Sequence, residues 1–135
     1  MRSRVALLFL CLIPSQILAH NSKRSQHSKL DPAYSSALAA ANRFLHAWQT
    51  QDHETGIMML SDAAREHVSP EQLQEFFSPS GAAAFEIEHG RKLNVRSYAF
   101  PVVLFGRATA GERPRSCTMV LVRAGKDDWA VEKLP

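Results

Sequence analysis

The chain has 135 residues, enough for one domain with one hydrophobic core. Its formal net charge is +3, but five basic residues precede position 31, and residues 31–135 carry 11 Lys and Arg against 13 Asp and Glu. The domain is therefore slightly acidic, which removes the compositional argument for binding nucleic acid, and no nucleic-acid partner is expected.

Residues 1–19 have the features of a secretory signal peptide. Arg2 and Arg4 give a positive start, and the apolar run over 5–13 is too short to span a bilayer stably. Ala19 offers a cleavage site. We therefore predict an exported protein, periplasmic or secreted, that keeps no stable membrane span after cleavage. An uncleaved anchor is the alternative, and the short apolar run disfavours it.

Residues 20–30 are polar and are predicted to form a flexible tail before a domain over 31–135. Signal cleavage would leave Cys117 as the only cysteine, so no internal disulfide is expected. Its strand-like surroundings favour a buried, inert thiol, and an intermolecular disulfide is the alternative. No metal-ligand spacing or phosphate-binding glycine loop occurs, so neither a metal nor a cofactor is expected.

A helix is predicted over 31–51. Asp31 can accept the free N–H groups of the first turn, and Pro32 suits the first helical position. Apolar residues recur at steps of four and three, and the stripe comprises Tyr34, Leu38, Ala41, Leu45 and Trp48, with Ala37 and Phe44 on its flanks. The residues expected to face water are Arg43, His46 and Gln49.

Two short helices are expected next. The first follows Asp52, a capping residue, and carries the apolar run 57–60, although Gly56 weakens its helical propensity. The second begins with a capping-box pattern over 69–72. Between them, residue 61 or 62 starts a further turn.

From residue 85 the apolar residues alternate, which indicates β-structure. The segments are 85–88, 93–105, 116–123 and 129–134, and Pro101 in the second allows a break or an edge position. About four antiparallel strands are predicted. Helices followed by an antiparallel meander are typical of an α+β fold with the helices packed on one face of the sheet.

The charges divide along the chain. Residues 31–88 carry two Arg and no Lys against nine acidic residues, whereas residues 89–135 carry nine basic residues against four acidic ones. The favoured interpretation is a pair of solvated faces that attract each other weakly. The alternative is a basic sheet surface for an anionic ligand or partner, formed by Arg91, Lys92, Arg96, Arg107, Arg113 and Arg115.

Several short motifs occur in a familiar order: Phe44 and Trp48 near the end of the first helix, Gln51-Asp52, Met58-Met59-Leu60-Ser61, Ser69-Pro70-Glu71-Gln72-Leu73, and the closing segment 125–131. In this order and spacing, residues 31–135 resemble the nuclear transport factor 2-like superfamily. The chain looks most like the small exported members of unknown function. The resemblance implies a cone-shaped, cystatin-like α+β fold, in which a long N-terminal helix and two short helices pack on a curved antiparallel sheet of about four strands. It also implies an apolar cavity between the first helix and the sheet, and often dimerisation through the sheet.

Some members of that superfamily are enzymes that place carboxylates, Tyr or His inside the cone. None of their catalytic residues can be carried over to a position here, so no catalytic residue is assigned. Most acidic residues are explained as caps or turn residues. Alternation places Glu86 toward solvent and puts Tyr98 on the same strand face as Arg96, which indicates mixed exposure.

The main functional hypothesis is an exported, non-catalytic domain that binds a small apolar or amphipathic ligand in the cone. Its candidate contacts are the aromatic residues Phe44, Trp48, Phe76, Phe77, Tyr98, Phe100 and Trp129. The alternative is that these rings only fill the core.

Two other hypotheses remain open. In the first, the domain is a protein-interaction module that pairs through its open sheet face, as a homodimer or with another partner. Alternatively it is a cone-fold isomerase, dehydratase or hydrolase, which requires a buried carboxylate such as Glu86, Glu88 or Glu132.

Overall fold

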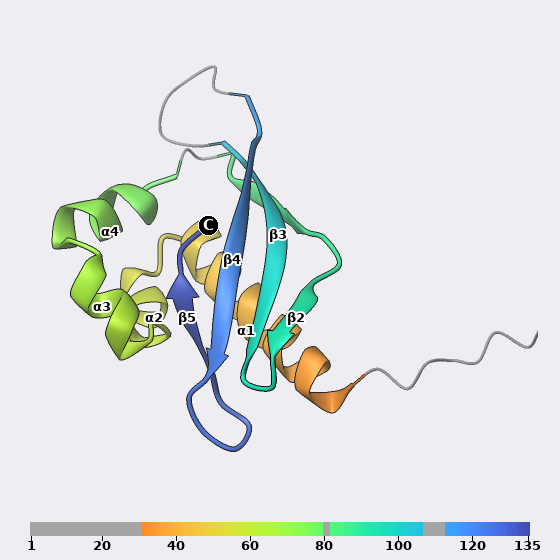
Figure 1. Cartoon of the computed structure of the whole chain (residues 1–135). Helices are drawn as coiled ribbons and strands as arrows, with labels where there is room; N and C mark the ends of the chain where they lie inside the picture. The colour runs from red at the N-terminus through yellow and green to blue at the C-terminus, as the bar shows by residue number, and fades with distance from the viewer. Residues whose placement is uncertain (1–30, 80–81, 107–112) are drawn as a thin grey trace, which may run out of the picture.

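The computed structural model describes residues 31–79, 82–106 and 113–135, which form an α+β fold with an antiparallel, open five-stranded sheet (Figure 1). The expected signal peptide (1–19) and tail (20–30) lie outside the described residues. The elements in chain order are α1 (Pro32–Gln49), α2 (His53–Met58), α3 (Asp62–His67), α4 (Pro70–Phe76), β1 (Ala84–Ile87), β2 (Arg91–Asn94), β3 (Ser97–Phe105), β4 (Arg115–Arg123) and β5 (Trp129–Lys133).

Helix α1 is capped by Asp31, whose carboxylate accepts a hydrogen bond from the backbone N–H of Ala33 at 3.0 Å. The helix ends at Gln49, two residues before the expected end, and Gln51 adopts a left-handed backbone with φ of 58°. Gln49 does not face water as expected. It is half-buried, and its side-chain amide donates to the carbonyl oxygen of Ala83 at 2.8 Å. Both glutamines thereby tie the end of α1 to the segment before β1, since Gln51 donates to the carbonyl oxygen of Pro79 at 3.1 Å.

Three short helices follow α1, one more than predicted. The additional helix is α3, and Ser61 is its cap, accepting from the N–H of Ala64 at 3.1 Å. The predicted capping box of α4 is confirmed, because Ser69 and Gln72 exchange both of its hydrogen bonds, at 2.9 and 3.2 Å. Helix α2 stops at Met58, so that the next residues can pair with β5.

The sheet has five strands rather than about four, because the predicted segment 93–105 is divided by a turn. The side chain of Asn94 accepts from the N–H of Arg96 at 2.8 Å, which is a local Asx turn, and the chain then reverses into β3. Arg96 therefore lies in a turn and does not share a strand face with Tyr98. Tyr98 is 2% exposed, so the expectation of mixed exposure was wrong.

The strand order is β1-β3-β4-β5, and β2 also pairs with β3. Pro101 lies inside β3, where a missing N–H would ordinarily break the ladder. Its carbonyl oxygen accepts from the N–H of Glu88, between the end of β1 and the start of β2. The N–H and C=O of a strand residue point to the same side of the strand. The missing N–H of Pro101 therefore falls on the edge of β3 where its partner changes from β2 to β1.

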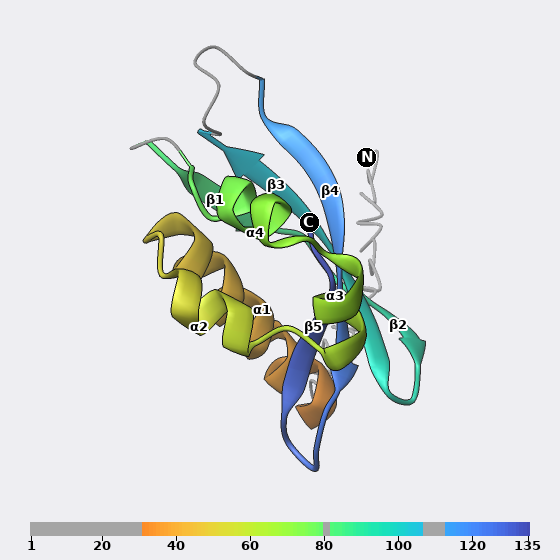
Figure 2. The ribbon, with the colours of Figure 1, turned by 90° about the vertical axis from the view of Figure 1, so that its left-hand side faces the viewer.

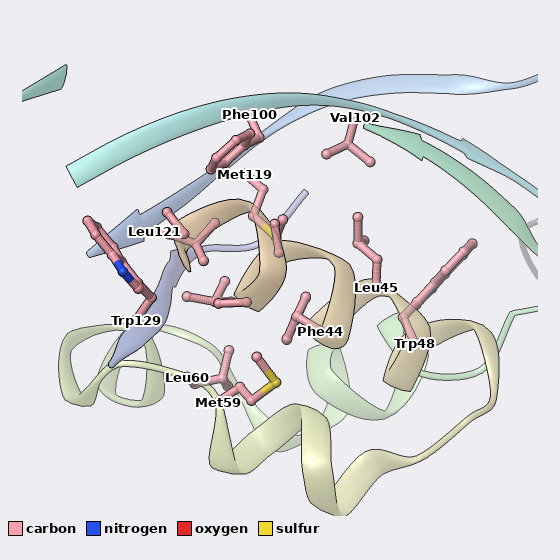
Figure 3. Packing of buried hydrophobic residues seen from close by; sticks show 14 of the residues in the cluster. Phe44, Leu45, Trp48, Met59, Leu60, Phe100, Val102, Met119, Leu121 and Trp129 are labelled. Atoms are coloured by element: carbon pink, nitrogen blue, oxygen red, sulfur yellow. The ribbon is translucent and has the colours of Figure 1, made fainter. Parts of the chain in front are cut away.

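The core lies between α1 and the sheet. Figure 3 shows Phe100, Val102, Met119 and Leu121 of the sheet facing Phe44, Leu45 and Trp48 of α1, with Met59 and Leu60 below them. All nine side chains belong to one buried cluster. The helices lie on the same side of the sheet, and the α2–α3 connection runs beside β5 (Figure 2). Backbone bonds join that connection to Val131, which accepts from Ser61 at 2.9 Å and donates to Met59 at 2.8 Å.

Cys117 on β4 is half-buried rather than buried, and its thiol lies 3.4 Å from the carbonyl oxygen of Val102.

Candidate functional site

The seven aromatic residues predicted as ligand contacts lie mostly in the core. Six of them are at most 5% exposed, namely Phe44, Trp48, Phe77, Tyr98, Phe100 and Trp129, and Phe76 is half-buried against the same cluster. Whether any of them contacts a ligand stays a prediction. The region between α1 and the sheet, where the resemblance implies a cavity, holds packed side chains that include Phe44, Trp48 and Phe100.

The rings gather into two groups. Toward the end of α1, Phe44 packs edge-on against Phe77, with ring centroids 5.6 Å apart, and Phe76 lies 5.9 Å from Phe44 and 6.2 Å from Trp48. At the other end, Tyr98 lies 6.3 Å from Phe100 and 5.4 Å from Trp129.

A hollow of ≈ 780 Å³ opens beside Trp129. It is bordered by α2, α3 and the β4–β5 hairpin, and side chains from α1 and from the β2–β3 turn also line it. Of the seven predicted aromatic residues, Trp129 alone lines this hollow. A smaller hollow of ≈ 280 Å³ lies along α1, and it shares Arg43, Asp128 and Trp129 with the first. The larger volume falls in the range of roughly 300–1,000 Å³ that small-molecule sites occupy.

Part of the lining is apolar. Met59, Leu60, Trp129 and Ala130 are buried at its floor, whereas Met58 at the end of α2 is 71% exposed. The backbone pairing between the α2–α3 connection and Val131 holds this floor in place. An apolar floor of this kind can cover the hydrocarbon part of a ligand.

Four arginines line the same hollow: Arg43 of α1, Arg65 of α3, Arg96 of the β2–β3 turn and Arg123 of β4. Arg65 donates to the carbonyl oxygen of Met58 at 3.2 Å and lies 3.8 Å from the Asp62 carboxylate. Arg96 donates from its guanidinium to the carbonyl oxygen of Arg123 at 3.3 Å. The guanidinium of Arg123 lies 5.3 Å from the ring centroid of Trp129, a cation–π distance.

Most of these four arginines were not predicted from the sequence as site residues. The predicted basic surface included Arg96, but Arg91, Lys92, Arg113 and Arg115 do not line the hollow, and Arg107 lies outside the described residues. One feature of the sequence could have indicated two of the four arginines. Arg43 and Arg65 are the only basic residues, apart from histidines, in the acidic segment 31–88.

A separate polar cluster ties the start of α1 to the sheet. The hydroxyl of Tyr98 donates to the Asp31 carboxylate at 2.8 Å, and the Lys92 ammonium lies 3.8 Å from the same oxygen. The hydrogen bond from Tyr98, helped by the N–H of Ala33, lowers the pKa of Asp31. Burial and the bond to Asp31 raise the pKa of Tyr98.

Beside this cluster, the Tyr34 hydroxyl accepts from the N–H of Gly90 at 3.1 Å and lies 3.4 Å from Nδ1 of His89. Tyr98, Asp31 and Lys92 are all absent from the lining of the hollow. The cluster thus joins the start of α1 to β2 and β3 and lies outside the hollow.

The three carboxylates named as candidates for the buried acid of a cone-type enzyme lie at the surface, since Glu86, Glu88 and Glu132 are all exposed. Glu86 thus faces solvent, as predicted. Within the described ranges, no three His, Cys, Asp or Glu residues come together as a metal site would require. The helices described here also include none with the length and apolar character needed to cross a membrane.

Comparison with known proteins gives no match to a protein-family model and no match among curated proteins.

Proposed function

We propose that this chain is an exported, non-catalytic ligand-binding domain that takes a small amphipathic molecule in the hollow beside Trp129. The single observation that carries the proposal is the hollow itself. Its volume is ≈ 780 Å³, and it combines an apolar floor with cationic side chains from α1, α3 and the sheet. The signal-peptide pattern of residues 1–19 supports export to the periplasm or the exterior.

We also propose that the domain belongs to the nuclear transport factor 2-like superfamily, with a cone-shaped sheet around α1. The motif order supports this assignment. A bent sheet is supported by the register shifts between Lys92 and Asn94 and between Val120 and Leu121, because bulges increase local twist and bend a strand. In this proposal the ligand binds beside the cone, since the aromatic residues between α1 and the sheet are packed together.

The test is a binding measurement with a blocked hollow. Ala124 is exposed and lines the hollow, so Ala124→Trp would fill part of it, whereas Ala63→Trp adds the same ring to an exposed position of α3 outside it. Decanol and decanoate are titrated into each purified protein by calorimetry. We expect Ala124→Trp to weaken binding at least tenfold and Ala63→Trp to leave it unchanged. Absence of binding for both compounds, or equal binding by the two variants, would refute the proposal.

A second function, pairing of two copies through the sheet, is favoured by one observation. The face of the sheet away from α1 carries half-buried apolar side chains at Pro101, Val103, Val120 and Val122. None of the described helices lies over that face, which is turned toward the viewer in Figure 1. The enzyme hypothesis has no comparable support, because the three carboxylates named as candidates for its buried acid are exposed.

A further inference from the structure

We propose that the hollow is selective for an anionic head group, so that its ligand is an amphipathic oxyanion, a carboxylate or phosphate with an apolar chain. This inference rests on the proposed function and adds the charge class of the ligand. It starts from the placement of the basic residues. The segment 31–88 is strongly acidic, yet both of its arginines, Arg43 and Arg65, line this one hollow.

The positive charge of the hollow is only partly balanced. Its lining contains four arginines and two aspartates, Asp62 and Asp128, which leaves two positive charges. Of these four arginines, within the described ranges, only Arg65 makes an ion pair, with Asp62, while Arg123 also interacts electrostatically with Asp31 outside the hollow. Across the same ranges, Arg43 and Asp128 make no ion pair, and Arg43 is exposed. A ligand with a negative group would supply the missing counter-charge.

Two adjacent N–H donors at the hollow also lack acceptors. Nε of Arg123 and Nε1 of Trp129 are buried, and neither has a hydrogen-bond partner in the described structure. Their residues pair across the β4–β5 hairpin, and Trp129 is 5% exposed. A buried donor without an acceptor destabilises the folded state, because the hydrogen bonds that it makes to water when exposed are not replaced. Since both nitrogens are covered, an anion would reach them through a rotamer change of Arg123, while the outer guanidinium nitrogens of Arg43 and Arg123 make the first contact.

The chemistry of guanidinium groups selects the head group. Arginine binds carboxylate and phosphate oxygens through paired N–H donors, and such charge-assisted bonds are stronger than neutral ones. The apolar chain of the ligand would lie along the exposed side chain of Met58 and over Leu60 on the floor of the hollow. A neutral alcohol of equal length could use this floor but would leave the arginines without a counter-charge.

The test compares ligands that differ only in the head group. Decanoate, decyl phosphate, decanol and decyltrimethylammonium are titrated by calorimetry into the wild type, Arg43→Gln and Arg115→Gln. Arg115 is the matched control, because it is an exposed arginine outside the hollow whose loss changes the net charge equally. Acetate and inorganic phosphate test the head groups alone.

We expect decanoate or decyl phosphate to bind the wild type at least tenfold more tightly than decanol, and decyltrimethylammonium more weakly still. Arg43→Gln should weaken binding of the anion about fivefold to tenfold and leave decanol unchanged, because the lost contact is a charge-assisted bond. Arg115→Gln should have less than a twofold effect. Raising the salt concentration should weaken binding of the anions only.

The failure of this inference differs from the failure of the proposed function. Equal affinity for decanol and decanoate, or an equal loss with Arg43→Gln and Arg115→Gln, would overturn the anion selectivity while ligand binding stands. Absence of binding for all four amphipaths would overturn both. Tight binding of inorganic phosphate alone would overturn the amphipathic part of the assignment.

Discussion

Gly56 shows how one residue sets the packing of a short helix. Its hydrogen lies against the ring of Phe77, and a Cβ at this position would overlap that ring. Phe77 is fully buried and is held by Phe44 and Phe76, so the ring has little room to move. Gly56 weakens the helical propensity of α2, but the packing of α2 against Phe77, the cap residue that follows α4, requires it.

We predict that Gly56→Ala lowers the free energy of unfolding by up to about 2 kcal/mol. Overpacking costs roughly 1–3 kcal/mol, and the gain in helix propensity returns only about 1 kcal/mol. Urea denaturation measures the change. Ala63→Gly, at an exposed position in α3, is the control for propensity alone and should cost about 0.5–1 kcal/mol. A more stable Gly56→Ala variant would show that the Phe77 ring relaxes freely.

The bond between Tyr98 and Asp31 makes stability depend on pH at both ends of the range. The folded-state pKa of Asp31 is below its ordinary value of 3.8, so its contribution is present above pH 3.8 and is lost as the pH falls through the lower folded value. The folded-state pKa of Tyr98 is above 10.0, so its contribution is present below pH 10.0 and is lost as the pH rises beyond it.

We predict that Tyr98→Phe weakens the acid-side dependence, because Ala33, Lys92 and Arg123 still stabilise the Asp31 carboxylate, and removes the alkaline one. The difference in unfolding free energy between the wild type and Tyr98→Phe should be largest between about pH 4 and pH 10, and should shrink beyond either limit. Urea denaturation from pH 2.5 to pH 11 gives the two curves. Asp127 is an exposed carboxylate in the β4–β5 turn, so the curve of unfolding free energy against pH for Asp127→Asn should run parallel to that of the wild type. Parallel curves for Tyr98→Phe would contradict the prediction.

At the scale of elements, local signals located several helix starts. Asp52, Ser61 and Ser69 each cap a helix where a side-chain oxygen meets the free N–H groups of the first turn. The strands were harder to divide. Alternation continues through Asn94 to Ser97 in the sequence, and only the Asn94 side chain, bonded to the N–H of Arg96, turns β2 back into β3.

The candidate site could be predicted even less from the sequence, because its residues are brought together by tertiary structure. Arg43, Arg65, Arg96 and Arg123 come from four segments and share no spacing. The aromatic residues posed the opposite problem. Phe44 and Trp48 occupy positions on a helical stripe that suit a cavity wall and a packed core equally, and only the contacts with Phe76 and Phe77 distinguish the two.

At the scale of the whole molecule, the two faces of the sheet differ. The inner face is covered by α1, whereas the outer face carries Val103, Val120 and Val122 without cover from the described helices. Contiguous apolar side chains on a sheet face that the described helices leave uncovered are typical of an interaction surface. The outer face and the hollow adjoin, because Val122 belongs to both, so pairing through the outer face would reach the edge of the hollow.

We predict that the purified protein forms a dimer through this outer face and that Val120→Lys dissociates it. Val120 pairs with Ala99 at the centre of the outer face, and an unpaired charge buried there should raise the dimer dissociation constant more than tenfold. Sedimentation velocity over a concentration series measures the constant. Ala63→Lys, which adds the same charge to α3, should remain dimeric. A wild type that stays monomeric at the highest concentration would exclude pairing, and dissociation of both variants would place the interface elsewhere. If Val120→Lys is monomeric and still binds decanoate with wild-type affinity, the sheet face and the hollow act independently.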